Sequence, residues 1–137
     1  MFNQILLVDN DSINNYLSCL ALRSKYGNVN IIIKRDGKDA LNYLRICSAS
    51  DITSMPDLII LDTMMPIMDG FELLEDPLWK SLCYNGKIVI LTEHLCFQNR
   101  KKATELGLKH LLEKPLSAEK LEGITNHKMS LYSETEN

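Results

Sequence analysis

The stretch from Pro56 to Gly70 constrains the fold of this chain more than any other. It contains four consecutive apolar residues, Leu58 to Leu61, which is the pattern of a strand buried on both faces of a sheet. The strand ends on a carboxylate, Asp62, and the Asp69-Gly70 pair marks a turn further on. Open α/β sheets bind ligands at the carboxyl ends of their strands. Asp62 is therefore expected at a site of chemistry rather than in a packing role.

Length and charge restrict the class of protein. A chain of 137 residues is expected to form one domain with its own core. Its net charge of −3 argues against a nucleic-acid-binding face, which needs clustered Lys and Arg. No apolar stretch reaches the roughly 20 residues that span a bilayer, and residues 1–4 lack the basic region of a signal peptide. We expect a cytoplasmic protein that binds neither nucleic acid nor membrane.

Cysteine and histidine spacing gives no sign of a metal or redox centre. The four cysteines lie far apart and predict reduced, mostly buried thiols. The three histidines lack metal-ligand spacing and predict surface or partly buried side chains. These residues are Cys19, Cys47, Cys83 and Cys96, and His94, His110 and His127.

Strand-like and helix-like segments alternate along the chain. Strands are expected at 4–8, 29–33, 58–61, 87–92 and 110–113. Apolar residues at helical spacing predict helices after Asp11 or Ser12, around 40–47, from Gly70, over 98–106 and after Ser117. Loops are expected at 48–55 and 79–86. Asp69 and Glu72 have capping-box spacing, and Pro77 should end the third helix early.

Five such units predict an α/β fold, with a single parallel sheet and helices on both faces. The expected arrangement is the flavodoxin-like, doubly wound order 2-1-3-4-5. In that order Asp9, at the end of the first strand, lies beside Asp62. Two neighbouring acids repel unless a cation is bound between them, and Mg²⁺ suits an all-oxygen site.

Two further side chains are expected at the same edge of the sheet. Thr92 ends the fourth strand and Lys114 follows the fifth. A hydroxyl and an ammonium group facing Asp62 would suit a phosphoryl group on that carboxylate. Mg²⁺ and Lys114 would then neutralise the charge that develops during transfer.

Taken in order, the motifs make the chain resemble the receiver domain of bacterial two-component response regulators. The motifs are Val8-Asp9-Asn10-Asp11, the run 57–70, Leu91-Thr92 and Lys114-Pro115. The resemblance covers residues 1–132 as the domain, with 133–137 as a polar tail. It implies that Asp62 accepts phosphate from a histidine kinase or phosphotransfer protein. It also implies a Mg²⁺ site formed by Asp9, Asn10, Asp62 and the Met64 main-chain carbonyl, with Thr92 and Lys114 contacting the phosphoryl group.

The sequence departs from the family pattern at two positions. Asn10 stands where the family usually has a second acid, so Mg²⁺ affinity should fall because an amide brings no charge. Asp11 follows but should project differently. Leu111 stands where the family usually has an aromatic ring, so a switch coupled to Thr92 is expected to be small or to run through His110.

About twenty residues follow Pro115, so a stand-alone regulator is expected, acting by binding a downstream protein or by phosphorelay rather than as an ordinary enzyme. The resemblance points to 100–105 and 110–111 as the signalling face, with the loop 93–97 carrying most of the change. One alternative is a receiver-like interaction domain that has lost phosphorylation because of Asn10. A haloacid-dehalogenase-type phosphatase is a second alternative, but that family has an Asp two residues after its nucleophile, where this chain has Met64.

Overall fold

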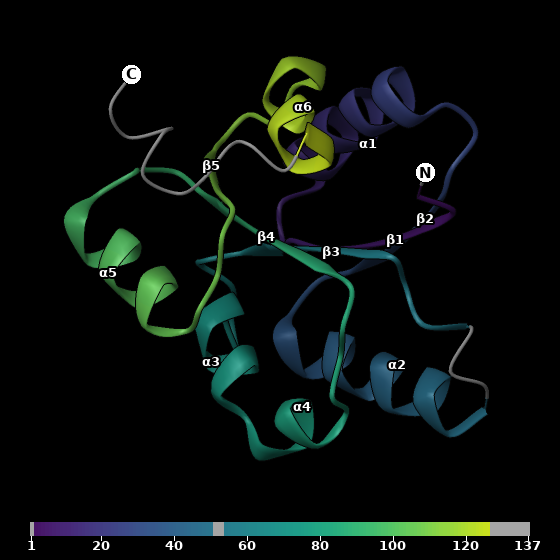
Figure 1. Ribbon diagram of the computed structural model, residues 1–137, viewed down its shortest axis with the longest axis vertical. Helices are drawn as coiled ribbons and strands as arrows, with labels where there is room; N and C mark the ends of the chain where they lie inside the picture. Colours follow the sequence, from purple (N-terminus) through teal and green to yellow (C-terminus); the bar gives the residue numbers. More distant parts are fainter. Residues whose placement is uncertain (1, 51–53, 127–137) are drawn as a thin grey trace.

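Five parallel strands form one sheet in the computed structural model, which describes residues 2–50 and 54–126 (Figure 1). The strand order is β2-β1-β3-β4-β5, as predicted. The strands are β1 (Gln4–Val8), β2 (Asn30–Lys34), β3 (Leu58–Asp62), β4 (Lys87–Thr92) and β5 (Leu111–Glu113). Because all pairs are parallel, the carboxyl ends of the strands lie along one edge of the sheet.

Helices cover both faces of the sheet. Figure 1 shows α1 and α6 on one face and α2, α3, α4 and α5 on the other. The helices are α1 (Ser12–Tyr26), α2 (Gly37–Ser50), α3 (Gly70–Glu75), α4 (Pro77–Ser81), α5 (Phe97–Glu105) and α6 (Ala118–Asn126). None of the helices in the described part of the chain is long and apolar enough to cross a membrane.

Each strand face builds its own core because successive side chains of a strand point to opposite sides. In β1, Leu6 and Val8 pack toward α2 to α5, whereas Ile5 and Leu7 pack toward α1 and α6. Every residue of β3 is buried, which confirms the prediction of a strand covered on both faces.

Local capping sets the helix ends that frame the sheet edge. The Asp11 carboxylate accepts hydrogen bonds from the backbone of Ile13 and caps α1. Asp69 and Glu72 form the predicted capping box on α3. Helix α3 ends just before Pro77, as predicted, but Pro77 also begins α4. Residues 79–81 are therefore helical, although a loop was expected over 79–86. Proline is tolerated at the first helical position because its missing N–H needs no partner there.

Several predicted boundaries were wrong by a few residues. Strand β2 runs from Asn30 to Lys34 instead of 29–33, and α2 continues to Ser50. Helix α5 spans 97–105 instead of 98–106, and β5 begins at Leu111. Of the cysteines only Cys47 is buried and Cys83 is exposed, so the expectation of mostly buried thiols was wrong; all four are free thiols. His110 is buried, so the prediction of surface or partly buried histidines was wrong for it. His127 and the tail 133–137 lie outside the described residues.

Of the four apolar residues whose spacing predicted α1, three (Ile13, Leu17 and Leu20) face solvent, and only Ala21 is buried. Ile13, Tyr16, Leu17 and Leu20 lie on one side of the helix and are exposed, and we call them the α1 stripe. The buried side carries Asn15 and Ser18 beside Ala21 and Leu22. The Asn15 side-chain Nδ2 donates to the Asp9 main-chain carbonyl at 2.9 Å, whereas its buried Oδ1 has no hydrogen-bond partner in the described structure.

Candidate functional site

The sheet brings two acids together at its carboxyl edge. Val8 pairs with Leu61 across β1 and β3, so Asp9 and Asp62 follow on neighbouring strands. Both carboxylates are almost fully buried. The Nζ atom of Lys114 lies 3.1 Å from Oδ2 of each acid, and it lies 3.7 Å from Oε1 of Glu93. The predicted trio of Asp9, Asp62 and Lys114 therefore forms one ion cluster.

Burial and like charge determine the protonation of this cluster. Burial, followed by repulsion from Asp9, raises the pKa of Asp62 to about 6, although Lys114 and the Met64 amide lower it in part. Burial alone would lower the pKa of Lys114, but Asp62 and Asp9 outweigh that effect and the pKa is raised. The cluster thus sets one cationic side chain against two acidic ones, an excess of acidic groups that a further cation could balance.

A hollow of about 230 Å³ opens onto these charges. Its lining consists of Asp9, Asn10, Asp11, Asn14, Asp62, Met64, Glu93 and Lys114. The buried Oδ2 atom of Asp9 contacts the Lys114 ammonium at 3.1 Å and has no other hydrogen-bond partner among residues 2–50 and 54–126. Such an oxygen suits a hard cation. Across residues 2–50 and 54–126, however, no group of three or more His, Cys, Asp or Glu side chains is placed to hold a metal ion.

The residues around the two acids differ in how free they are to bind a cation. Asn10 is exposed at the rim, and its main-chain carbonyl accepts a hydrogen bond from Arg35 at 2.7 Å, which leaves its side chain out of that contact. Asp11 is committed to capping α1. The Met64 amide donates to Asp62 Oδ1 at 3.2 Å, which holds the start of the β3–α3 loop against the site.

Thr92 lies beside this cluster, but its hydroxyl is not part of the hollow's lining. The side chain is buried, and Oγ1 donates to the His94 carbonyl at 3.1 Å. The same oxygen accepts hydrogen bonds from Thr63 at 3.3 Å and from the Asn99 amide at 3.0 Å. In this state the hydroxyl is held by its neighbours rather than aimed at Asp62.

Gly70 allows α3 to start directly behind Asp62. A Cβ atom on Gly70 would lie 2.5 Å from the Asp62 carbonyl oxygen and 3.1 Å from the Leu61 Cβ atom. Only glycine permits this approach without a backbone shift. The sequence pair Asp69-Gly70 thus provides both the cap of α3 and its close approach to the Asp62 main chain.

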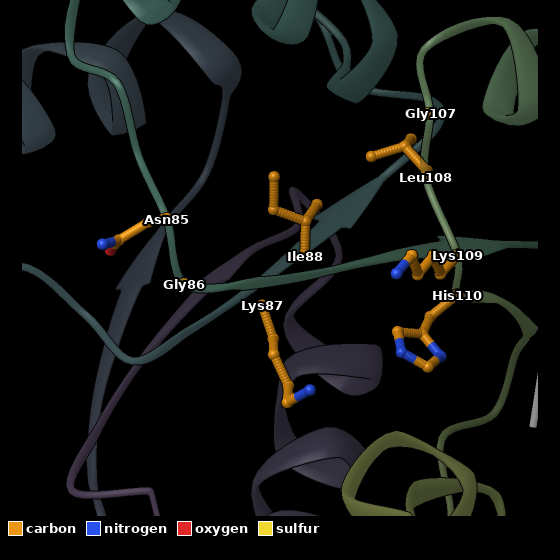
Figure 2. A pocket seen from close by; sticks show the side chains of 8 residues that line it. All are labelled: Asn85, Gly86, Lys87, Ile88, Gly107, Leu108, Lys109 and His110. Atoms are coloured by element: carbon orange, nitrogen blue, oxygen red, sulfur yellow. The ribbon is translucent and has the colours of Figure 1, made fainter. Parts of the chain in front are cut away.

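A second hollow of about 300 Å³ lies at the opposite edge of the sheet. Figure 2 shows Lys87, at the start of β4, and Lys109 and His110, just before β5, around it. The amino ends of parallel strands meet here, so this hollow is remote from Asp62. Its lining contains no carboxylate, and it does not belong to the ion cluster.

Sequence reasoning missed three residues that contact the site. Glu93 faces Lys114, Arg35 donates to the main-chain carbonyl of Asn10, and Asn99 donates to Thr92. The only sequence signal for Glu93 is its position directly after a strand-end residue. Arg35 follows the end of β2, which is the same kind of signal. Asn99 lies within α5, where nothing in the local pattern separates it from a solvated helix residue.

Comparison with known proteins identifies the family. The sequence pattern of the response regulator receiver domain matches residues 5–126, and the chain belongs to this family. It is 31% identical over 129 residues to Two-component response regulator 24 of Arabidopsis thaliana, covering 94% of this chain and 86% of that protein. A two-component response regulator structure from Cytophaga hutchinsonii superposes with a TM-score of 0.81 at 25% identity, covering 92% of this chain and 96% of the other.

Coverage of the relatives varies. The chain is 28% identical to the transcriptional regulatory protein SphR of Synechococcus elongatus over 87% of its own length but only 46% of that protein. It is 31% identical to the probable methanogenesis regulatory protein FilR2 of Methanothrix harundinacea over 85% of its own length and 75% of that protein. The likeness therefore concerns the receiver part shared by these regulators.

Proposed function

We propose that this chain accepts a phosphoryl group on Asp62 from a histidine kinase or phosphotransfer protein in a Mg²⁺-dependent reaction. The observation that carries the proposal is the ion cluster, in which a buried carboxylate with a raised pKa faces Lys114 and a hollow at the carboxyl edge of the sheet. Phosphate then signals through a downstream protein or is passed along a relay. Such a donor system would place the chain in the cytoplasm.

Each residue of the cluster has a role in the proposed transfer. An Asp62 carboxylate oxygen attacks phosphorus, a P–O bond forms, and the P–N bond to the donor histidine breaks, returning the electron pair to the imidazole. Lys114, which already contacts Asp62, stabilises the charge on the phosphoryl oxygens. Asp9, Asn10, Asp62 and the Met64 carbonyl would hold Mg²⁺, which supplies further charge neutralisation when bound.

A receiver-like interaction domain without phosphorylation is the second candidate. It is favoured by Asn10, which leaves the site without a third acidic ligand. Beryllofluoride with Mg²⁺, a mimic of the phosphoryl group, separates the two candidates. We expect saturable binding, detected as amide shifts around Asp62, and we expect no binding when Mg²⁺ is replaced by a chelator. Shifts that never saturate at millimolar beryllofluoride would favour the interaction domain.

The α1 stripe is the proposed docking surface for the phosphodonor. Ile13 is 72% exposed, and its neighbour Asn14 lines the hollow that contains Asp62. A protein that delivers phosphate to this hollow must cover the adjacent start of α1. Exposed apolar patches of this kind commonly mark protein interaction sites.

Polar substitution in the α1 stripe should slow transfer from a protein donor only. With a purified histidine phosphotransfer protein that phosphorylates the wild-type chain, we expect Ile13→Ser to slow the reaction by about fivefold or more. Uptake from the small donor acetyl phosphate should be unchanged. Ile46→Ser is the control, since Ile46 is 50% exposed on α2, at the other face of the sheet. Equal slowing by both variants would contradict this docking surface.

A further inference from the structure

Asn99 occupies an unusual place between the buried hydroxyl of Thr92 and the first turn of α5. Its Nδ2 atom donates to Thr92 Oγ1 at 3.0 Å and to the His94 carbonyl at 3.1 Å. One amide group therefore contacts both partners in the hydrogen bond that the Thr92 hydroxyl itself makes. The residue lies in α5, so this contact joins the end of β4 to a helix.

The start of α5 lacks the usual side-chain cap, which makes the Asn99 contacts notable. Cys96 is the N-cap residue, and its side chain makes no capping hydrogen bond. Phe97, the first helical residue, is 75% exposed. In the described structure, the side-chain hydrogen bonds that tie the first turn of α5 to the sheet edge are those of Asn99.

The hydroxyl of Thr92 cannot serve two acceptors at once. A hydroxyl has one proton to donate, and here that proton is directed to the His94 carbonyl. Its oxygen meets donors from Thr63, Asn99 and the His94 amide, which is more than its two lone pairs can serve well. If the proton turns to a phosphoryl oxygen on Asp62, the bonds to His94 and Asn99 must rearrange together.

We propose that Asn99 is the positioning residue that couples the state of Thr92 to helix α5. The inference rests on the proposed phosphorylation of Asp62 and names how that event reaches the surface. With Asp62 free, the Asn99 amide bridges Thr92 and His94 and holds the first turn of α5. When Thr92 turns to the phosphoryl group, Asn99 keeps only His94, and the loop 93–96 and the first turn of α5 shift. One hydrogen bond of this kind biases a two-state equilibrium by about threefold to tenfold.

Amide shifts with beryllofluoride and Mg²⁺ test the coupling in the full chain. In the wild type we expect shifts around Asp62 and also across residues 93–105. In Asn99→Leu, which removes the donor at similar volume, we expect binding at Asp62 within about threefold of wild type and shifts over 97–105 reduced by about threefold or more. Gln98→Leu, an exposed neighbour on the same turn, should behave as wild type.

A purely structural role for Asn99 gives a different result. It would lower thermal stability, yet the shifts over 97–105 would match wild type, and that outcome overturns the proposal. If Asn99→Leu frays α5 in the free protein, Asn99→Asp gives the same comparison, because an acid suits the first turn of a helix but cannot donate when ionised. Loss of all shifts in the wild type, including those around Asp62, would instead overturn the proposed phosphorylation, and the coupling with it.

Discussion

The Asp62→Asn variant should take up no phosphoryl group from acetyl phosphate and Mg²⁺, whereas the wild-type chain takes up one. The amide keeps the size of the side chain, but it is a far weaker nucleophile and forms no stable acyl phosphate. Asp62 also faces Lys114 at 3.1 Å, the contact that would stabilise the transferred group. Intact mass, recorded rapidly at neutral pH, measures the uptake directly.

The control for this experiment is Asp39→Asn, which makes the same chemical change at an exposed position in the first turn of α2. It should be labelled as fully as the wild type. Equal labelling of Asp62→Asn and wild type would place the acceptor on another residue and would remove the basis of the proposed function.

The Asp62→Asn variant should also be more stable than the wild type at pH 7 without Mg²⁺. The pKa of Asp62 is raised to about 6 in the folded protein, above its value of 3.8 in the unfolded chain, so the folded state loses stability as pH rises between these values. Discounting for solvent at the open hollow, Asp62→Asn should gain roughly 1–2 kcal/mol at pH 7 and almost nothing near pH 3.5. Urea unfolding at the two pH values measures the difference.

Asn10→Asp should bind Mg²⁺ more tightly than the wild type. The substitution adds a third carboxylate to the two proposed acidic ligands, Asp9 and Asp62, and charge-assisted contacts are about twice as strong as neutral ones. We expect a gain of about 1 kcal/mol or more, which is about fivefold or more in the dissociation constant. Without metal, the crowded acids should lower the unfolding free energy by roughly 0.5–1 kcal/mol.

Calorimetric or fluorescence titration with Mg²⁺ measures this change. Asn28→Asp is the matched control, because Asn28 is exposed between α1 and β2, at the opposite edge of the sheet from Asp62. If Asn10→Asp leaves the affinity unchanged, then Asp11 or solvent already supplies the missing ligand, despite the use of Asp11 as the α1 cap.

The sheet could be predicted from sequence because its signals are strong and local. The short apolar run before Asp62 predicts a buried strand, and the structure confirms it. The strand order then brings Asp9 and Asp62 to neighbouring strand ends. Lys114 was predicted at the same edge, and the structure places it between the two acids. The residues of the ion cluster thus follow from where strands end, which a sequence reveals well.

Other features depend on tertiary contacts that a sequence pattern does not encode. The α1 stripe looks like a core-facing pattern, but Asn15 occupies the buried side because the Asp9 carbonyl offers it a partner. Asn99 bonds a hydroxyl and a carbonyl from a different element, so its local pattern carries no signal. Thr92 was expected to face Asp62 directly, yet its neighbours hold its hydroxyl away from the hollow.

Locating the phosphoryl group within the chain tests the central claim most directly. The protein is treated with acetyl phosphate and Mg²⁺ and then reduced with borohydride, which converts an aspartyl phosphate to homoserine, and its peptides are sequenced by mass spectrometry. We predict homoserine at position 62 and at no other aspartate. Homoserine at another position, with residue 62 recovered as unmodified Asp, would contradict the account.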